Sequence, residues 1–270
     1  MIEKRTVFKN IDVFYTDQGS GITIILLHGY LETVEIWEEF KPLLTDQFRV
    51  ICVDLPGHGK SGVWGKIHDL GDLAGSVKAV MEAENIDRVF LVGHSMGGYV
   101  TIAFAELYPG RLLGYSLFHS TCFADSEEKK ANRDREVSLV LCKKKQQIIN
   151  VNIPKAFADC NVGRLRSHVS LAMRIALQNP DKGIVAVLNG MKSRPDRTSV
   201  LADPSLPLLL IGGMKDNYIP AEVFERLVGL APHADVVRLN ESGHMGFIEE
   251  PDLSAEAIGH FIEKNRPARE

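Results

Sequence analysis

A serine flanked by glycines is the first feature of this sequence that could do chemistry. The segment from Gly93 to Gly97 matches the pattern G-x-S-x-G, with Ser95 at its centre. This pattern is typical of a sharp turn between a strand and a helix. Such a turn strains the backbone at the serine, and the glycines leave room for the neighbouring chain. The following helix would present backbone N–H groups to a developing negative charge, so we expect Ser95 to be a nucleophile.

A serine hydroxyl needs a base to take its proton and an acid to orient that base. Nine histidines are available, and His244 lies just beyond the last expected strand. Asp216 follows the strand expected at 206–211, whereas Asp125 lies further from the end of the preceding strand. Open α/β sheets place their sites beyond the carboxyl ends of strands. We therefore expect Ser95, His244 and Asp216 to form a catalytic triad, with Asp216 favoured over Asp125 as the acid.

These side chains must be positioned by a sheet. Unbroken apolar runs, which suit strands buried on both faces, occur at 22–27, 50–53, 89–92, 206–211 and 236–239. A further strand is expected at 112–118, and residues 6–9 and 11–15 predict an antiparallel edge pair. Helices are expected at 96–108, 220–230 and 252–264, and behind Asp69 as an N-cap. This order predicts a three-layer α/β fold with a mostly parallel sheet and an antiparallel N-terminal edge.

The stretch from 121 to 195 interrupts the alternation of strands and helices. It has helical patterns at 127–145 and from Leu165 to Ala176, and Asn179 and Pro180 cap a third. We expect a core domain at 1–120 and 196–270, with a helical lid at 121–195 inserted between two of its strands. Long insertions on α/β scaffolds often carry binding roles.

Four motifs, in this order, resemble the serine-dependent α/β-hydrolase superfamily over essentially the whole chain. They are Leu27 to Tyr30, Asp54 to Ser61, the turn at Ser95, and the loops of Asp216 and His244. The length and the lid are most similar to those of small esterases and enol-lactonases. The resemblance implies Ser95 as nucleophile, His244 as general base and then acid, and Asp216 as the orienting carboxylate.

The same resemblance implies an oxyanion hole from the backbone N–H groups of Tyr30 and Met96. We expect His28 to brace this loop and His94 to pack nearby. Relatives that cleave epoxides or haloalkanes carry Asp at the position of Ser95, so the serine favours acyl transfer. Pocket-wall candidates lie beside the motifs or in the lid: Leu31, His119, Phe123, Phe157, Ile219, Met245 and Phe247.

Composition and spacing argue against several other functions. The formal charge of −4 comes with no basic cluster, and no apolar run could span a bilayer, so we expect neither nucleic-acid nor membrane partners. The four cysteines lack metal-ligand spacing and no signal peptide is seen, which favours the cytoplasm. Gly57 to Gly62 matches G-x-G-x-x-G, but no helix follows directly, so nucleotide binding is disfavoured. We expect no metal and no cofactor.

The sequence therefore predicts a carboxylic ester hydrolase that acts through an acyl-enzyme on a small or medium acyl ester or lactone. Two alternatives use the same triad. One is a receptor-like hydrolase with slow turnover, and the other is a carbon–carbon bond hydrolase or a cofactor-free peroxidase. The sequence does not indicate an oligomeric state.

Overall fold

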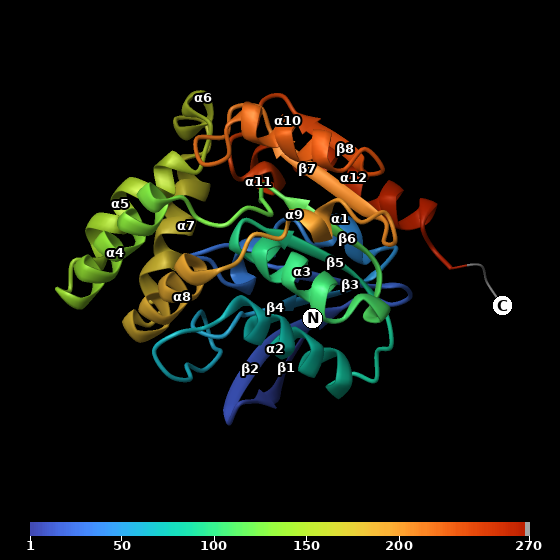
Figure 1. Cartoon of the computed structure of the whole chain (residues 1–270), viewed down its shortest axis with the longest axis horizontal. Helices are drawn as coiled ribbons and strands as arrows, with labels where there is room; N and C mark the ends of the chain where they lie inside the picture. The colour runs from blue at the N-terminus through green and yellow to red at the C-terminus, as the bar shows by residue number, and fades with distance from the viewer. Residues whose placement is uncertain (268–270) are drawn as a thin grey trace.

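One eight-stranded sheet runs through the molecule in the order β1-β2-β4-β3-β5-β6-β7-β8 (Figure 1). The computed structural model describes residues 1–267. The strands are β1 (Ile2–Phe8), β2 (Ile11–Gln18), β3 (Thr23–Leu27), β4 (Arg49–Val53), β5 (Val89–His94), β6 (Leu112–Phe118), β7 (Leu208–Gly213) and β8 (Asp235–Leu239). β2 is antiparallel to both β1 and β4, and all other neighbours are parallel. This confirms the expected mostly parallel sheet with an antiparallel N-terminal edge.

The central strands are covered on both faces. Every residue of β3, β5 and β7 is buried. Side chains of a strand point alternately to the two faces, so a strand in the middle of such a sheet must be apolar on both. This explains why these strands read as continuous apolar runs in the sequence.

The N-terminal hairpin is longer than the sequence indicated. β1 begins at Ile2 rather than near Thr6, and β2 continues to Gln18. Lys9, expected in the first strand, instead forms a two-residue turn with Asn10, and both have positive φ (48° and 62°). Such turns match the twist of antiparallel strands. The outer strand was partly missed because most of its residues are exposed, so its apolar signal is weak.

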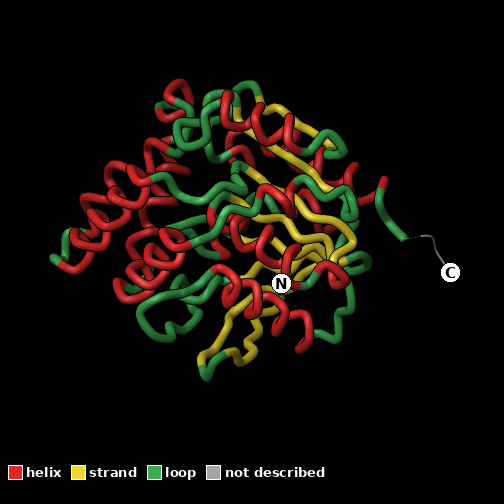
Figure 2. Tube along the Cα trace, in the orientation of Figure 1, coloured by secondary structure: helices red, strands yellow, loops and turns green. Residues whose placement is uncertain are grey.

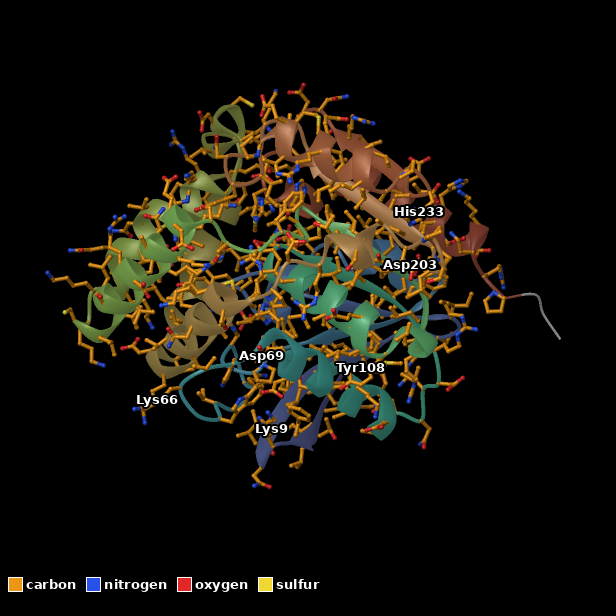
Figure 3. The ribbon with its side chains drawn as sticks, viewed as in Figure 1. Lys9, Lys66, Asp69, Tyr108, Asp203 and His233 are labelled. Carbon is orange, nitrogen blue, oxygen red and sulfur yellow. The ribbon has the colours of Figure 1, made fainter. Side chains whose placement is uncertain are left out.

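Helices cover both faces of the sheet. They are η1 (Val34–Trp37), α1 (Pro42–Thr45), α2 (Leu70–Ala83), α3 (Met96–Leu107), η2 (Pro109–Arg111), α10 (Ala221–Leu230), α11 (Gly246–Glu249) and α12 (Pro251–Lys264). α2 and α3 pack together on one face, while α1 and α12 pack together on the other. Asp69 lies at the start of α2 (Figure 3), where its carboxylate accepts the Gly71 N–H at 2.8 Å, as the N-cap prediction required.

Between β6 and β7 the chain leaves the sheet and forms a group of helices at one side of the molecule (Figures 1 and 2). We call α4 to α8 the insertion: α4 (Glu127–Leu141), α5 (Lys145–Lys155), α6 (Asp159–Val162), α7 (Arg166–Gln178) and α8 (Asp181–Ser193). The short α9 (Thr198–Leu201) follows. The helical pattern at 127–145 is broken after Leu141, where Lys143 has a φ of 61°. Across residues 1–267, the helices are all too short or too polar to cross a membrane.

Candidate active site

Ser95 occupies a strained turn between β5 and α3. Its φ is 50° and its ψ is −113°, an unfavourable conformation for a residue with a side chain. The surrounding chain requires glycine: a Cβ on Gly93 would collide with Gly97 O, and one on Gly97 would collide with Leu27 O. Ser95 N donates to Phe118 O at 3.0 Å, and the Ser120 hydroxyl donates to Ser95 O at 2.7 Å. The turn is therefore held from the neighbouring strand β6.

The loops after β7 and β8 bring Asp216 and His244 together. His244 Nδ1 lies 2.7 Å from Asp216 Oδ2. The other carboxylate oxygen, Oδ1, accepts the N–H groups of Tyr218 (2.7 Å) and Ile219 (3.0 Å). The acid and the imidazole are both 6% exposed. Because the Asp216 carboxylate is an acceptor, it holds a proton on His244 Nδ1 and leaves Nε2 free to act as a base.

Two imidazoles share the Asp216 carboxylate. His119, which follows β6, is 1% exposed, and its Nδ1 lies 3.4 Å from Asp216 Oδ2. Its Nε2 accepts the Gly246 N–H at 3.1 Å. Burial alone would raise the pKa of Asp216, but His244 and His119 hold that pKa well below its ordinary value. Burial lowers the pKa of His119 to about 4, so this ring is neutral at neutral pH.

Among residues 1–267, His119, Asp216 and His244 form the one buried cluster that could hold a metal ion, with ligand atoms within 4.8 Å of one another. Metal-ligand spacing in the sequence gave no sign of it, because the residues follow three different strands. In the structure these residues are already joined to one another through Asp216 Oδ2, which lies 2.7 Å from His244 Nδ1 and 3.4 Å from His119 Nδ1. A metal here would have to replace the Asp216–His244 hydrogen bond.

The loop after β3 lies beside the turn of Ser95 and contains Tyr30. Gly29 N donates to the Glu32 carboxylate at 2.6 Å, and Leu31 N donates to His58 Nε2 at 3.2 Å. In the described part of the chain, the N–H groups of Tyr30 and Met96 donate to no protein acceptor. These two donors are the ones expected to form an oxyanion hole.

His28 joins this loop to the segment after β4. Its Nε2 accepts the Leu55 N–H at 3.0 Å, and its Nδ1 lies 2.8 Å from Gly29 O. This pattern requires a neutral ring protonated on Nδ1. Burial lowers the pKa of His28 and so favours that neutral form. The Asp54 carboxylate braces the same region, because it accepts Val34 N at 2.7 Å and Lys60 N at 2.8 Å.

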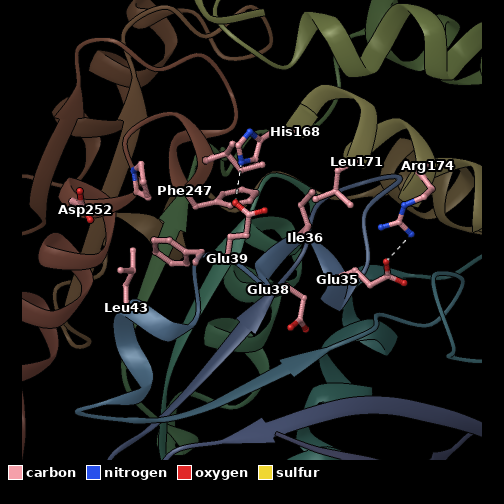
Figure 4. Close-up of a pocket in the computed structure, with 13 residues that line it drawn as sticks. Glu35, Ile36, Glu38, Glu39, Leu43, His168, Leu171, Arg174, Phe247 and Asp252 are labelled. Atoms are coloured by element: carbon pink, nitrogen blue, oxygen red, sulfur yellow. Dashed lines mark hydrogen bonds and ion pairs between the residues drawn. The ribbon is translucent and has the colours of Figure 1, made fainter. Parts of the chain in front are cut away.

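The predicted wall residues lie in different surroundings. Leu31, Phe157, Met245 and Phe247 are each at most 2% exposed. Ile219 adjoins the Asp216 carboxylate through its own N–H, whereas the guanidinium of Arg226 lies 4.3 Å from the ring centroid of Phe123. The Phe247 ring packs against Trp37 with centroids 4.3 Å apart. The Phe247 ring also lines a cavity of about 410 Å³ between η1, α7 and α11 (Figure 4).

This cavity is separate from the expected catalytic residues. Its lining includes neither Ser95, Asp216 nor His244. A hydrogen bond and an ion pair cross it between the core and α7: Glu39 with His168 at 2.9 Å, and Glu35 with Arg174 at 3.1 Å (Figure 4). The cavity therefore marks where the insertion meets the core.

Sequence reasoning missed a buried carboxylate that organises the loop of His244. Glu249, on α11, is 5% exposed. Its Oε2 accepts the N–H groups of Gly243 (2.8 Å) and Met245 (3.1 Å), and its Oε1 accepts Ala158 N (2.8 Å) and the Asn161 amide (2.9 Å). The only available signal was an acidic residue directly after the apolar stretch from Met245 to Ile248. Glu249 thus fixes the residues on both sides of His244 and ties them to the insertion.

Comparisons with known proteins agree with this architecture. The family described as "alpha/beta hydrolase fold" matches residues 22–122. A 2-hydroxy-6-oxononadienedioate/2-hydroxy-6-oxononatrienedioate hydrolase of Cupriavidus pinatubonensis is 31% identical, over 84% of this chain and 82% of its own length. Another relative, from Pseudomonas putida, is the dihydrolipoyllysine-residue acetyltransferase component of the acetoin cleaving system. It is 28% identical over 91% of this chain, and the chain spans 64% of the length of that relative.

A solved structure extends the likeness to three dimensions. A thermophilic esterase from Thermogutta terrifontis is similar with a TM-score of 0.93 at 28% identity, covering 99% of this chain and 100% of its own. The sheet order, the turn at Ser95 and these relatives agree with one another. The chain is therefore a hydrolase-type enzyme that belongs to the α/β-hydrolase family.

Proposed function

We propose that the protein is a carboxylic ester hydrolase that works through an acyl-enzyme on Ser95. The observation that carries the proposal is the hydrogen bond of 2.7 Å between Asp216 Oδ2 and His244 Nδ1, in loops that follow the strands β7 and β8. This bond orients the imidazole so that Nε2 can serve as a base. The strained turn between β5 and α3 carries Ser95, which is half-buried.

The chemistry proceeds in two halves. His244 Nε2 takes the Ser95 hydroxyl proton as Oγ attacks the ester carbonyl carbon. The carbon–oxygen bond to the alcohol then breaks, and the alcohol leaves with the proton from Nε2. Water attacks the acyl-enzyme, gives its proton to Nε2, and the bond to Oγ breaks as Ser95 regains that proton and the carboxylic acid is released. The reacting groups are side chains, main-chain N–H groups and water.

The oxyanion formed in each half needs donors. We assign this role to the N–H groups of Tyr30 and Met96. Support comes from their lack of protein acceptors among residues 1–267, whereas the adjacent Gly29 and Leu31 N–H groups are already used. A donor that is free in the resting protein can hold the charge when it develops, at no cost of breaking another bond.

We assign the insertion the role of a lid that shapes the acyl pocket. It contacts the site loops directly: Ala156 O accepts His244 N at 2.7 Å, and the Asn179 amide donates to Leu31 O at 3.0 Å. The Tyr30 hydroxyl is buried and has no hydrogen-bond partner among residues 1–267. Burial and the neighbouring Glu136 of α4 raise the pKa of this phenol. The mostly apolar candidate wall favours a small or medium acyl ester or lactone.

Turnover of a substrate panel tests the proposal. The panel holds p-nitrophenyl esters of increasing acyl length, a lactone, a thioester and 2-hydroxy-6-oxononadienedioate. We expect the highest kcat/KM for a short or medium ester, with a burst of p-nitrophenol that marks the acyl-enzyme. No turnover of any ester by folded protein would contradict the proposal.

One rival reaction has specific support. The relative from Cupriavidus pinatubonensis is named as a hydrolase of a 2-hydroxy-6-oxononadienedioate. Faster turnover of that compound than of every ester would favour carbon–carbon bond hydrolysis on the same residues. Covalent labelling of Ser95 without turnover of any compound would instead favour a receptor-like role.

A further inference from the structure

His94, the residue before Ser95, makes hydrogen bonds with both nitrogens of its ring. The ring is fully buried. Its Nδ1 lies 3.0 Å from Glu32 Oε2, and its Nε2 lies 2.8 Å from the main-chain oxygen of His244. A carboxylate and a carbonyl are both acceptors, so both ring nitrogens must carry protons to satisfy them. With Glu32 ionised, this geometry requires an imidazolium cation at the base of the turn.

Glu32 supplies the matching negative charge. It is 6% exposed, and its ion pair in the described part of the chain is with His94. The same Oε2 atom accepts the Gly29 N–H at 2.6 Å. A buried carboxylate is costly unless it is paired and hydrogen-bonded. Glu32 meets both conditions through His94 and the loop that carries Tyr30.

The surroundings favour the charged form of the pair. Burial lowers the pKa of His94, but Glu32 outweighs it and the net pKa is raised, with a further contribution from Asp216. Burial raises the pKa of Glu32, but His94 brings it below its ordinary value. The other titratable groups that face His94 are imidazoles: His244 and His119, with centroids 5.0 and 6.1 Å away, and His28, whose pKa His94 helps to lower.

We propose that Glu32 and His94 are positioning residues: their buried ion pair fixes the main chain of His244 and the loop of Tyr30 to the turn that carries Ser95. The inference rests on the proposed function, because it assigns these segments to catalysis. Glu32 acts through Gly29 N, and His94 acts through His244 O. One pair thereby sets the relative positions of the nucleophile, the base and the oxyanion donors. Displacing a catalytic group by about 1 Å can cost about 100-fold in rate.

Kinetics of variants provide the first test, with p-nitrophenyl acetate as the probe. His94→Leu removes the donor to His244 O and leaves Glu32 without its cation. We expect kcat to fall about 10- to 100-fold, with KM changed by less than about 3-fold, because substrate contacts remain. The double variant Glu32→Gln/His94→Gln keeps an amide donor near His244 O without buried charge. We expect it to recover most of the lost kcat.

His68→Leu is the matched control. His68 is also fully buried, and its ring lies against a main-chain oxygen, Pro56 O, at 2.9 Å. That contact lies outside the loops of Ser95, Tyr30 and His244. We expect the control to lose thermal stability while its kcat stays close to that of the parent. An equal loss of kcat in both leucine variants, or no loss in His94→Leu, would overturn the inference.

Nuclear magnetic resonance of the ¹⁵N-histidine-labelled resting protein provides a second test that needs no turnover. We expect both ring nitrogens of His94 to stay protonated above the ordinary histidine pKa of about 6.5, and to lose one proton below that value in Glu32→Gln. A neutral His94 ring at that pH in the parent would overturn the inference, even if esters are hydrolysed. An imidazolium in a protein that hydrolyses no ester would contradict the proposed function while leaving the ion pair established.

Discussion

The turn of Ser95 and helix α4 of the insertion are held in different ways. In α3, which begins directly after Ser95, ten of the twelve residues are buried. In α4, Val140 is the buried residue among fifteen. The first element is fixed by close packing, and interiors packed at that density tolerate little displacement. The second packs against α8 and α5 but leaves most of its own residues exposed or half-buried. The comparison teaches that the proposed reacting groups lie in turns and loops at the ends of buried strands, whereas α4 leaves most of its residues exposed or half-buried.

The charged groups differ in the same way. Near the strand ends, Asp216 and Glu249 each receive several N–H donors and are at most 6% exposed. On α4, ion pairs such as Lys130 with Glu127 are exposed, and exposed pairs contribute little to stability. We therefore expect substitutions at the strand ends to affect the chemical step, and substitutions on the insertion to affect stability and substrate range. The predictions below test this division.

The largest expected effect is that of Ser95→Ala. Removing the nucleophile should lower kcat by about 10⁶-fold. The hydroxyl supplies no hydrogen bond on which the turn depends, since the turn is held through Ser95 N and Ser95 O. We expect the melting temperature to stay near that of the parent. Ester turnover and thermal unfolding check both parts. Near-parental turnover would show that another residue attacks the ester.

Asp216→Asn should have the next largest effect. An amide in place of the carboxylate would favour the wrong tautomer of His244, and kcat should fall by about 10⁴-fold. Asp203→Asn is the matched control, because Asp203 is an exposed aspartate that accepts Ser205 N at 2.9 Å (Figure 3). We expect the control to keep its turnover rate. Comparable losses in the two variants would mean that Asp216 has no special role.

Arg194→Met tests the anchor of the insertion. Arg194 Nη1 lies 2.7 Å from Asp125 Oδ1, and Arg133 of α4 holds the same carboxylate. Removing one partner of a buried pair commonly costs about 3–5 kcal/mol, and the remaining arginine should keep the loss near the lower end. We expect a lower free energy of unfolding, measured with urea, and a kcat within about 10-fold of the parent.

Arg135→Met is the control for this prediction, since Arg135 is exposed and donates to the Asn132 side chain at 2.7 Å. Its free energy of unfolding should change by less than about 0.5 kcal/mol. If Arg135→Met lowered the free energy of unfolding as much as Arg194→Met, burial of the Arg194 side chain would not explain its contribution to stability.

The smallest expected effect is the pH dependence of the stability that the Asp125 carboxylate contributes. Burial raises the pKa of Asp125, but Arg133 and Arg194 bring it below its ordinary value. The carboxylate therefore stabilises the fold above the unfolded pKa of about 4, and this contribution is lost as pH falls through the lower folded pKa. The stability difference between the parent and Asp125→Asn should be constant at neutral pH and shrink below about pH 4. A stability difference that grows as the pH falls would have the opposite sign and would contradict this prediction.

Much of the fold could be predicted because buried parallel strands leave a continuous apolar signal. Leu208 to Ile211 illustrates this, since all four residues face packed layers. The outer strand was only partly visible, because exposed residues of β1 such as Lys4 carry no such pattern. The break between α4 and α5 was missed because it depends on the left-handed backbone of Lys143, which its residue type does not reveal.

The site divides along a similar line. Ser95, Asp216 and His244 could be proposed as a site because each lies in the turn or loop after a strand, and the ends of parallel strands meet at one edge. The residues that hold them could not be selected. His94 meets the main chain of His244 across 150 positions of sequence, and Glu249 meets Ala158 across 91. Contacts of this kind have no characteristic spacing, so only the folded structure reveals them.

Covalent labelling with diisopropyl fluorophosphate, followed by peptide mass spectrometry, tests the central assignment most directly. The account predicts one adduct, on the peptide that contains Ser95, formed quickly by the parent and at least about 10²-fold more slowly by His244→Gln. Labelling of a different residue, or an equal rate in the parent and in His244→Gln, would show that the imidazole and the hydroxyl do not act together.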